Sequence, residues 1–340
     1  MAEPRINIPS REIPTRAPSE TTADDTITPF EVAPLDLRGR VVRLGPAIND
    51  ILNAHDYPAP VSKLLAEAVA LTVLLGSALK ITGRLILQTQ TSGPVRMLVV
   101  DFTAPDEVRA CARFDAKRVE QAIAEGKASP GALLGEGHLA MTIDQGPDMN
   151  RYQGLVALNG EGLEAAAHEY FLRSEQIPTR VRLAVAEEFT AAEGGPRRAW
   201  RAGGIMAQFL PRAPERMRVA DLPPGDAPEG VTPHVVPEDE AWVEGRALME
   251  TVEDIELLDQ AVSSEQLLYR LFHERGVRVF NPVAIRAQCS CSRDGVEAML
   301  KSFPQDDRDH MVENGKVTVT CEFCSASYQF APAEVGAKTN

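Results

Sequence analysis

Residues 287–293 read Ala-Gln-Cys-Ser-Cys-Ser-Arg and residues 319–325 read Val-Thr-Cys-Glu-Phe-Cys-Ser, so four of the five cysteines of the chain lie in two close pairs. Cys289 and Cys291 form a C-x-C pair, and Cys321 and Cys324 form a C-x-x-C pair. Two such pairs on separate segments can bring four sulfurs to one point. Four thiolates about 2.3 Å from a tetrahedral centre are a preferred ligand set of Zn²⁺. We therefore predict a Cys₄ zinc site.

The segments around these cysteines predict a small domain built on the metal. A β-favouring run at 279–285 leads into the first pair, residues 294–303 have the pattern of a short amphipathic helix, and residues 316–320 alternate as a strand into the second pair. Apolar residues are scarce here. Metal binding is therefore expected to supply most of the folding free energy of this zinc-binding domain, residues 281–340.

Length, composition and charge restrict the class of protein. A chain of 340 residues with 44% apolar residues is long enough for two or three domains. The net charge of −14 argues against nucleic-acid binding as the main task, because phosphate contacts need a basic face. The uncharged apolar run at 68–79 is shorter than the roughly 18 residues that a membrane span needs, and no signal-peptide core is evident. Cysteines in metal spacing suit a reducing compartment, so we predict a cytoplasmic location.

The amino-terminal part of the chain changes character near residue 36. Residues 1–35 are rich in Pro, Thr, Ser, Arg and Glu and are predicted to be a disordered extension. A strand at 41–44 and a short helix at 47–55 follow. The helix that begins near residues 58–60 is apolar on most sides, which predicts a buried central helix.

From residue 83 the hydrophobic period changes to two, which is typical of strands. The predicted strands span residues 84–90, 95–100, 107–114, 138–143, 152–158, 180–186 and 204–210. The first two flank a Ser-Gly-Pro turn and predict an antiparallel hairpin, and residues 162–175 have a helical pattern. This succession favours an α+β domain with antiparallel sheets over residues 36–211.

A connector and a helical segment follow this domain. Residues 212–240 are rich in Pro, Glu and Asp and mark a domain boundary. The stretch up to residue 276 is highly charged but carries an apolar stripe, and Ser263 with Gln266 fits a capping box. Such a helix persists only while its stripe packs on another surface. The stripe consists of Leu257, Leu258, Val262, Leu267, Leu268, Leu271 and Phe272.

The residues leave two roles open for the cysteine cluster. A purely structural zinc is the commoner role of Cys₄ sites. Thiolates are also the species that oxidants attack, and an oxidised ligand loses its metal bond, so the same atoms can form a switch. A thioredoxin-like role for Cys321 and Cys324 is disfavoured because the pair follows a strand instead of opening a helix. Cys111 is predicted to be a buried residue of a strand.

No catalytic residue is predicted. The histidines show no metal-ligand spacing and no nucleophile partner, and the chain has no P-loop, G-x-G-x-x-G or G-x-S-x-G motif. The sequence therefore indicates a protein that is not an enzyme. The histidines are His55, His138, His168, His234, His273 and His310.

Four motifs together resemble one known family. Beside the C-x-C and C-x-x-C pairs, residues 291–293 read Cys-Ser-Arg, residues 151–154 read Arg-Tyr-Gln-Gly, residues 170–179 read Tyr-Phe-Leu-Arg-Ser-Glu-Gln-Ile-Pro-Thr, and residues 202–204 read Ala-Gly-Gly. This set resembles the 33 kDa chaperonin family, the redox-regulated heat-shock holdases, from about residue 39 to residue 330. The long polar extension at the amino terminus and the Pro-rich insertion near 212–237 depart from the family pattern.

The resemblance implies a switch of three parts: an antiparallel-sheet core, a metastable linker over residues 212–280 and the zinc domain. The reduced form would hold one Zn²⁺ per chain and be a poor chaperone. Oxidation would pair Cys289 with Cys291 and Cys321 with Cys324 and release the zinc. The active form, commonly a dimer, would hold unfolding proteins under heat and oxidative stress without ATP and pass them to ATP-driven chaperones.

The linker stripe gives this switch a physical basis. Its apolar side chains, once freed from their docking surface, would make a client-binding surface on a charged and soluble segment. We expect Leu267, Leu268, Leu271 and Phe272 to contribute to it. The alternative is a constitutive binding scaffold with a structural zinc.

Overall fold

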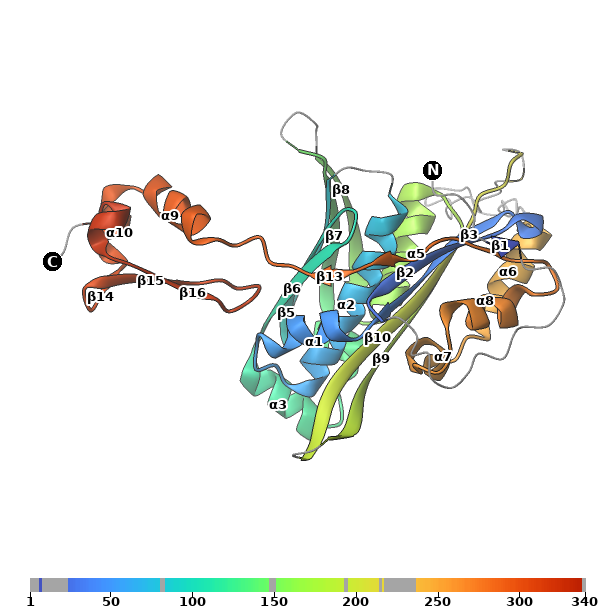
Figure 1. Cartoon of the computed structure of the whole chain (residues 1–340), viewed down its shortest axis with the longest axis horizontal. Helices are drawn as coiled ribbons and strands as arrows, with labels where there is room; N and C mark the ends of the chain where they lie inside the picture. The colour runs from blue at the N-terminus through green and yellow to red at the C-terminus, as the bar shows by residue number, and fades with distance from the viewer. Residues whose placement is uncertain are drawn as a thin grey trace, which may run out of the picture.

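The structure is a computed structural model that describes residues 6–7, 24–79, 83–146, 151–192, 195–213, 216 and 237–337. Two sheets enclose helix α2 (Ala59–Ala78), three further helices cover the outside of one sheet, and a small C-terminal module projects from the body (Figure 1). This arrangement confirms the predicted α+β class with antiparallel sheets and a central buried helix.

The first sheet has seven strands in the order β1-β11-β2-β3-β10-β9, with β12 paired to β2. All its pairings are antiparallel in the described residues, and the long β9–β10 hairpin forms one edge. The strands are β1 (Ile6–Asn7), β2 (Thr26–Val32), β3 (Leu37–Leu44), β9 (Thr179–Ala192), β10 (Gly195–Phe209), β11 (Arg278–Val279) and β12 (Val283–Ala284).

The second sheet has six strands in the order β13-β6-β5-β4-β7-β8. The predicted hairpin is confirmed, because β4 pairs antiparallel with β5. The pairing of β13 with β6 is parallel, and the others are antiparallel. The strands are β4 (Arg84–Thr91), β5 (Val95–Thr103), β6 (Glu107–Phe114), β7 (Glu136–Asp144), β8 (Tyr152–Asn159) and β13 (Arg286–Ala287).

Helix α2 fills the space between the two sheets and contacts strands of both. Its Leu and Val side chains are buried all round the helix, which explains why its sequence is apolar on every side. By length and composition its 20 residues are enough to cross a membrane, so the prediction that no segment is long enough is wrong. Most of the helix is instead buried in this core.

Shorter helices close the ends of the core. The predicted helices near 47–55 and 162–175 are present, the second ending in a π-helical turn, whereas two helices after β6 were not predicted. These elements are α1 (Pro46–Asn53), α3 (Ala116–Ala124), α4 (Pro130–Leu134), α5 (Leu163–Tyr170), the π-helical turn η2 (Phe171–Glu175) and the 3₁₀ turn η1 (Ala33–Leu35).

The prediction of a disordered extension is wrong for residues 26–35. Strand β2 pairs with β3 along its whole length, and Ile27, Phe30 and Val32 are buried. Residues 6–7 pair with β11. The polar composition concealed a strand whose apolar residues face two different cores. Residues 8–23 and most of the Pro-rich connector, at 214–215 and 217–236, lie outside the described residues.

The linker helices α6 (Glu240–Glu250), α7 (Asp254–Leu258) and α8 (Ser264–Phe272) lie on the face of the seven-stranded sheet opposite α2 (Figure 1). Three short helices thus replace the one helical stretch of the prediction, and the Ser263–Gln266 capping box is confirmed. The apolar stripe packs on this sheet face, which supplies the surface that such a stripe was expected to need. Leu267, Leu268, Leu271 and Phe272 are at most 4% exposed there.

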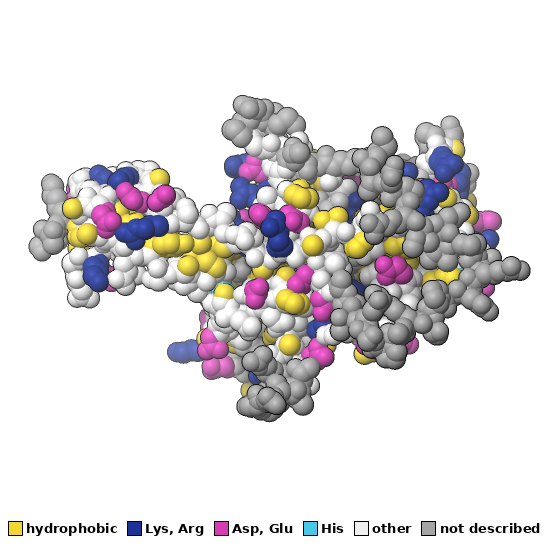
Figure 2. All heavy atoms as spheres, in the orientation of Figure 1, with side chains coloured by type: hydrophobic (Ala, Val, Ile, Leu, Met, Phe, Trp, Pro, Cys, Tyr) yellow, Lys and Arg dark blue, Asp and Glu magenta, His cyan; other side chains and the backbone are white. Residues whose placement is uncertain are grey.

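The C-terminal module, residues 289–337, has a very small core of Leu300, Val317, Phe330 and Val335. The helix and strand predicted within it are both present. Figure 2 shows hydrophobic side chains on the narrow connection between the module and the body. The elements are α9 (Arg293–Ser302), α10 (Gln305–His310), β14 (Val312–Glu313), β15 (Lys316–Thr320), β16 (Ser327–Phe330) and the 3₁₀ turn η4 (Pro332–Val335).

Candidate metal centre

The structure brings the four predicted cysteines together. Their Sγ atoms all lie within 4.8 Å of one another. The Sγ–Sγ distance is 3.7 Å between Cys289 and Cys321 and 3.3 Å between Cys291 and Cys324. Ligand atoms about 2.3 Å from a tetrahedral centre are about 3.8 Å apart, so the donor set fits a single metal ion of the Cys₄ type.

Local backbone structure presents the second pair. Between β15 and β16 the chain makes a tight turn in which the Cys321 N–H donates to the carbonyl of Ala326 (2.9 Å) and the Ser325 N–H donates to the carbonyl of Cys321 (2.9 Å). Ser325 adopts φ of 56°, in the left-handed region. This turn, residues 321–325, points both cysteine side chains to the same side.

The first pair lies between strand β13 and helix α9. Ser292 caps α9 by accepting from the Gly295 N–H (3.1 Å), so Cys291 directly precedes a helix N-terminus. The Tyr328 hydroxyl donates to the Cys291 Sγ (3.2 Å). Both features stabilise negative charge on sulfur.

All four thiols can be deprotonated at the same time only when a cation is bound. Burial raises the pKa of Cys324 to about 12, and hydrogen bonding with Cys291, Cys289 and Cys321 adds to the shift. A bound divalent cation removes this penalty because it stabilises every thiolate at once. Cys111 lies apart on β6, is 4% exposed, and has a pKa raised by burial to about 11.

Side chains of the core contact the turn at 321–325, which the sequence did not predict. Arg109 on β6 lies over the Phe323 ring, 4.1 Å from its centroid, and donates to the Ser290 hydroxyl (2.8 Å). His55 contacts the turn through both ring nitrogens. No sequence signal marks these residues, because their role depends on where the C-terminal module docks.

A strap, residues 277–288, joins the linker helices to the metal ligands. Its first part pairs with β2 in one sheet and its last part with β6 in the other. The Arg286 N–H donates to the carbonyl of Asp106 (2.8 Å), and the Gln288 N–H donates to that of Val108 (3.0 Å). The strap is therefore hydrogen-bonded to the core up to the residue before the first ligand.

Two buried arginines lie beneath linker helix α7. Arg43, 2% exposed, donates to the carbonyls of Asp259 (2.9 Å) and Glu256 (2.6 Å), and Arg201 donates to that of Leu258 (2.8 Å). Burial and the neighbouring Arg201 lower the pKa of Arg43 to about 10. The linker helices thus cover cations that would be hydrated if the helices left.

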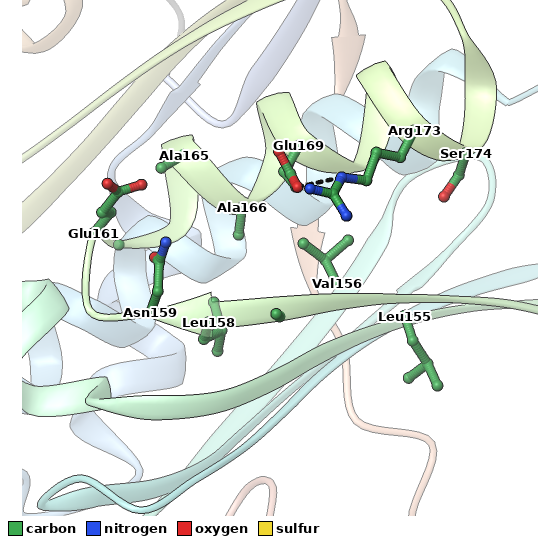
Figure 3. A pocket seen from close by; sticks show the side chains of 12 residues that line it. Leu155, Val156, Leu158, Asn159, Glu161, Ala165, Ala166, Glu169, Arg173 and Ser174 are labelled. Carbon is green, nitrogen blue, oxygen red and sulfur yellow. Dashed lines mark ion pairs between the residues drawn. The ribbon is translucent and has the colours of Figure 1, made fainter. Parts of the chain in front are cut away.

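A surface pocket of about 300 Å³ lies between β8 and α5 (Figure 3). Figure 3 shows two of its charged residues, Glu169 and Arg173, paired with each other, and Glu161 at its edge. None of the predicted site residues lines it, and it contains no cysteine or histidine.

Comparisons with known proteins agree with this arrangement. A family model described as Hsp33 protein matches residues 25–331. A 33 kDa chaperonin of Caulobacter vibrioides is 45% identical over 319 residues, which cover 93% of this chain and 98% of that protein. One from Pseudomonas putida is 35% identical over 302 residues, 88% of each chain. The crystal structure of a 33 kDa chaperonin from Thermotoga maritima has the same fold, with a TM-score of 0.69 over 92% of this chain and 97% of that one at 20% identity.

Proposed function

We propose, because the chain belongs to the Hsp33 protein family of chaperones, that it is a redox-regulated, ATP-independent holdase of the cytoplasm. The observation that carries the proposal is the strap, which connects a four-sulfur centre to helices with a buried apolar stripe. A change at the sulfurs can reach the stripe through this one continuous segment.

The reduced form holds one Zn²⁺ through Cys289, Cys291, Cys321 and Cys324. The ion, when bound, neutralises the four thiolates and so stabilises a module whose own core is too small to fold it. In each pair two thiolates, one hydrogen peroxide and two protons give one disulfide and two waters. Loss of the thiolates then releases the ion.

The proposed disulfides are Cys289–Cys291 and Cys321–Cys324. The two Sγ–Sγ contacts of 3.7 and 3.3 Å join cysteines of different pairs, but all four sulfurs lie within 4.8 Å of one another, so the local pairs are also within reach after a small rearrangement. Peptide mapping of the oxidised protein by mass spectrometry would identify the partners directly.

When the C-terminal module unfolds without its metal, the strap loses its attachment at that end, and the docking of the linker helices weakens. Strand β13 is only two residues long and adjoins the module, so few contacts hold it on β6 beyond its backbone pairing and the ion pairs of Arg286 with Asp106 and Glu107. Once the linker helices undock, the stripe that contains Leu267, Leu268, Leu271 and Phe272 is exposed and binds apolar segments of unfolding proteins. Two such chains form the active dimer, and clients pass later to ATP-driven chaperones.

The test combines three measurements on one sample. The reduced protein is treated with peroxide at mildly raised temperature, and zinc release, free thiols and suppression of the aggregation of an unfolding client are followed. We expect the three signals to change together and to reverse on reduction. A protein that loses zinc without gaining protection would refute the redox switch. Equal protection in the zinc-bound state would support a constitutive scaffold.

A further inference from the structure

One side chain of the core contacts both halves of the metal centre. Arg109 Nη1 donates to the hydroxyl of Ser290, the residue between Cys289 and Cys291 (2.8 Å). The same guanidinium lies over the ring of Phe323, one of the two residues between Cys321 and Cys324, 4.1 Å from the centroid. Arg109 therefore connects the two ligand pairs from outside, although it belongs to a different domain.

The Arg109 side chain is oriented by contacts within the core, independently of the C-terminal module. Its Nε and Nη2 both donate to Asp101 Oδ2, at 2.9 and 2.6 Å, and Asp101 lies directly opposite on strand β5. Asp101 is 5% exposed, so this pair is weakly screened by solvent. Burial alone would lower the pKa of Arg109, but its hydrogen bonds to Asp101 raise it overall. The guanidinium is thus charged and its orientation is fixed.

A second contact fixes the same turn. His55 Nε2 donates to the carbonyl of Phe323 (3.1 Å), and its Nδ1 accepts from the Ser325 hydroxyl (3.1 Å). The His55 ring stacks on Tyr57, with centroids 4.7 Å apart. Both contacts fix the turn at 321–325 against the outer face of β6.

We propose that Arg109 is a positioning residue of the metal centre, which holds the two cysteine pairs together and keeps the turn at 321–325 docked on β6. This inference rests on the proposed function only in taking the four cysteines as zinc ligands. A planar fork with several donors can bind Asp101 and Ser290 while its face stacks on Phe323, which an ammonium group cannot do.

Docking by Arg109 also covers a cysteine that can report on it. Cys111 follows two residues later on β6, so its side chain projects from the same face of the strand as that of Arg109. Cys111 is only 4% exposed although it does not belong to the core cluster between the sheets, so it is covered on the outer face of β6, where the turn at 321–325 docks. Undocking of the turn should therefore expose its thiol.

The test compares Arg109→Ala, Arg109→Lys and the control Arg96→Ala in the full-length, zinc-loaded, reduced protein. Arg96 is an exposed arginine of the neighbouring strand whose ion pair is with Asp115 of the core. Zinc transfer to a colorimetric chelator gives the release rate. Alkylation at Cys111, located by peptide mapping, measures docking.

We expect Arg109→Ala to release zinc about tenfold faster, since one charged hydrogen bond and one cation–π contact are lost. Alkylation at Cys111 should rise together with the rate of zinc release. Arg109→Lys should recover less than half of the change in the release rate. Arg96→Ala should match the wild type in both measurements. Unchanged zinc release in Arg109→Ala would overturn the positioning role while leaving the zinc site and the chaperone proposal intact. Full recovery by lysine would also overturn it, because a point charge would then suffice.

Discussion

Gly203→Ala should activate the chaperone without oxidation. Gly203 lies on β10 in the row that faces the linker helices, between Arg43 on β3 and Ala184 on β9. A Cβ at this position would lie 2.4 Å from the carbonyl oxygen of Leu257 in α7, where ordinary contacts begin at 3.4 Å. The backbone of Gly203 does not need a positive φ, so the added methyl group acts only on the docked helix.

The size of the effect follows from this contact. To restore an ordinary contact distance, helix α7 has to move by about 1 Å. The clashing oxygen belongs to the backbone, so it cannot rotate away as a side-chain atom can. Overpacking of this kind costs about 1–3 kcal/mol. That cost shifts the docking equilibrium of the linker helices by about 5- to 150-fold. The move also lengthens the hydrogen bonds of 2.6–2.9 Å from Arg43 and Arg201 to α7, which adds to the shift.

The matched control is Gly204→Ala. The next residue of the strand faces the opposite core, where a Cβ would meet the ends of the Leu183 and Leu74 side chains at 3.0 Å and the carbonyl oxygen of Arg182 at 3.1 Å, and none of these nearest atoms belongs to the linker helices. Both variants are kept reduced and zinc-loaded, and aggregation of a thermally unfolding client is followed by light scattering. Hydrogen exchange reports on the linker helices. We expect faster exchange and protection of the client in Gly203→Ala alone.

Two results would refute this reasoning in different ways. Unchanged exchange in α7 would mean that the packing contact does not control docking. Faster exchange without client protection, with zinc still bound, would mean that an undocked linker is not sufficient for activity. The substitution replaces none of the stripe residues, although it displaces the backbone of Leu257, so loss of a client-binding side chain could not explain a negative result.

Three further perturbations test the core and the module. Burial raises the pKa of Glu67 to about 7, so folding stability falls by about 2–3 kcal/mol from pH 5 to pH 8, and Glu67→Gln should flatten this slope in urea titrations. Burial and the nearby charge of Arg180 lower the pKa of His168 to about 4, and the neutral ring accepts from the Val181 N–H; stability is therefore lost as pH falls from about 6.5 to 4, and His168→Gln should lose less. A slope equal to that of the wild type would contradict either prediction. A chelator that strips zinc from the reduced protein should speed hydrogen exchange in residues 289–337 and in the strap but not in α2, and equal protection with and without metal would contradict a metal-dependent module.

The regular elements of the core were predictable because the apolar pattern of each one matches the faces that it buries. Leu85 and Leu87 alternate with more exposed residues on β4, and the apolar residues of α2 surround the helix because sheets lie on both sides. The cysteine spacing likewise predicted which side chains meet, since metal ligands must converge. Both signals are local patterns with a single physical cause.

Contacts that form only when distant segments of the chain meet leave no such local pattern in the sequence. Strand β2 contains Pro29, and its two faces are buried in different hydrophobic cores. Its sequence therefore shows no clear alternation of apolar and polar residues. The strap pairs through segments of two residues, too short for any alternation. Arg109 and Ser290 are 181 positions apart in the sequence, and their meeting depends on the whole path of the strap across both sheets.

A buried arginine lowers the energy with which the linker helices dock. Burying four large side chains of the stripe favours docking by about 6–12 kcal/mol. Docking also holds Arg43 out of water, at several kcal/mol for the cation, and the Arg43 Nε is buried without a hydrogen-bond partner in the described structure. Arg201 beside it keeps its ion pair with Asp24. The burial of Arg43 therefore offsets part of the apolar gain, and the hydrogen bonds of the strap and of Arg109 contribute to whether the linker stays docked.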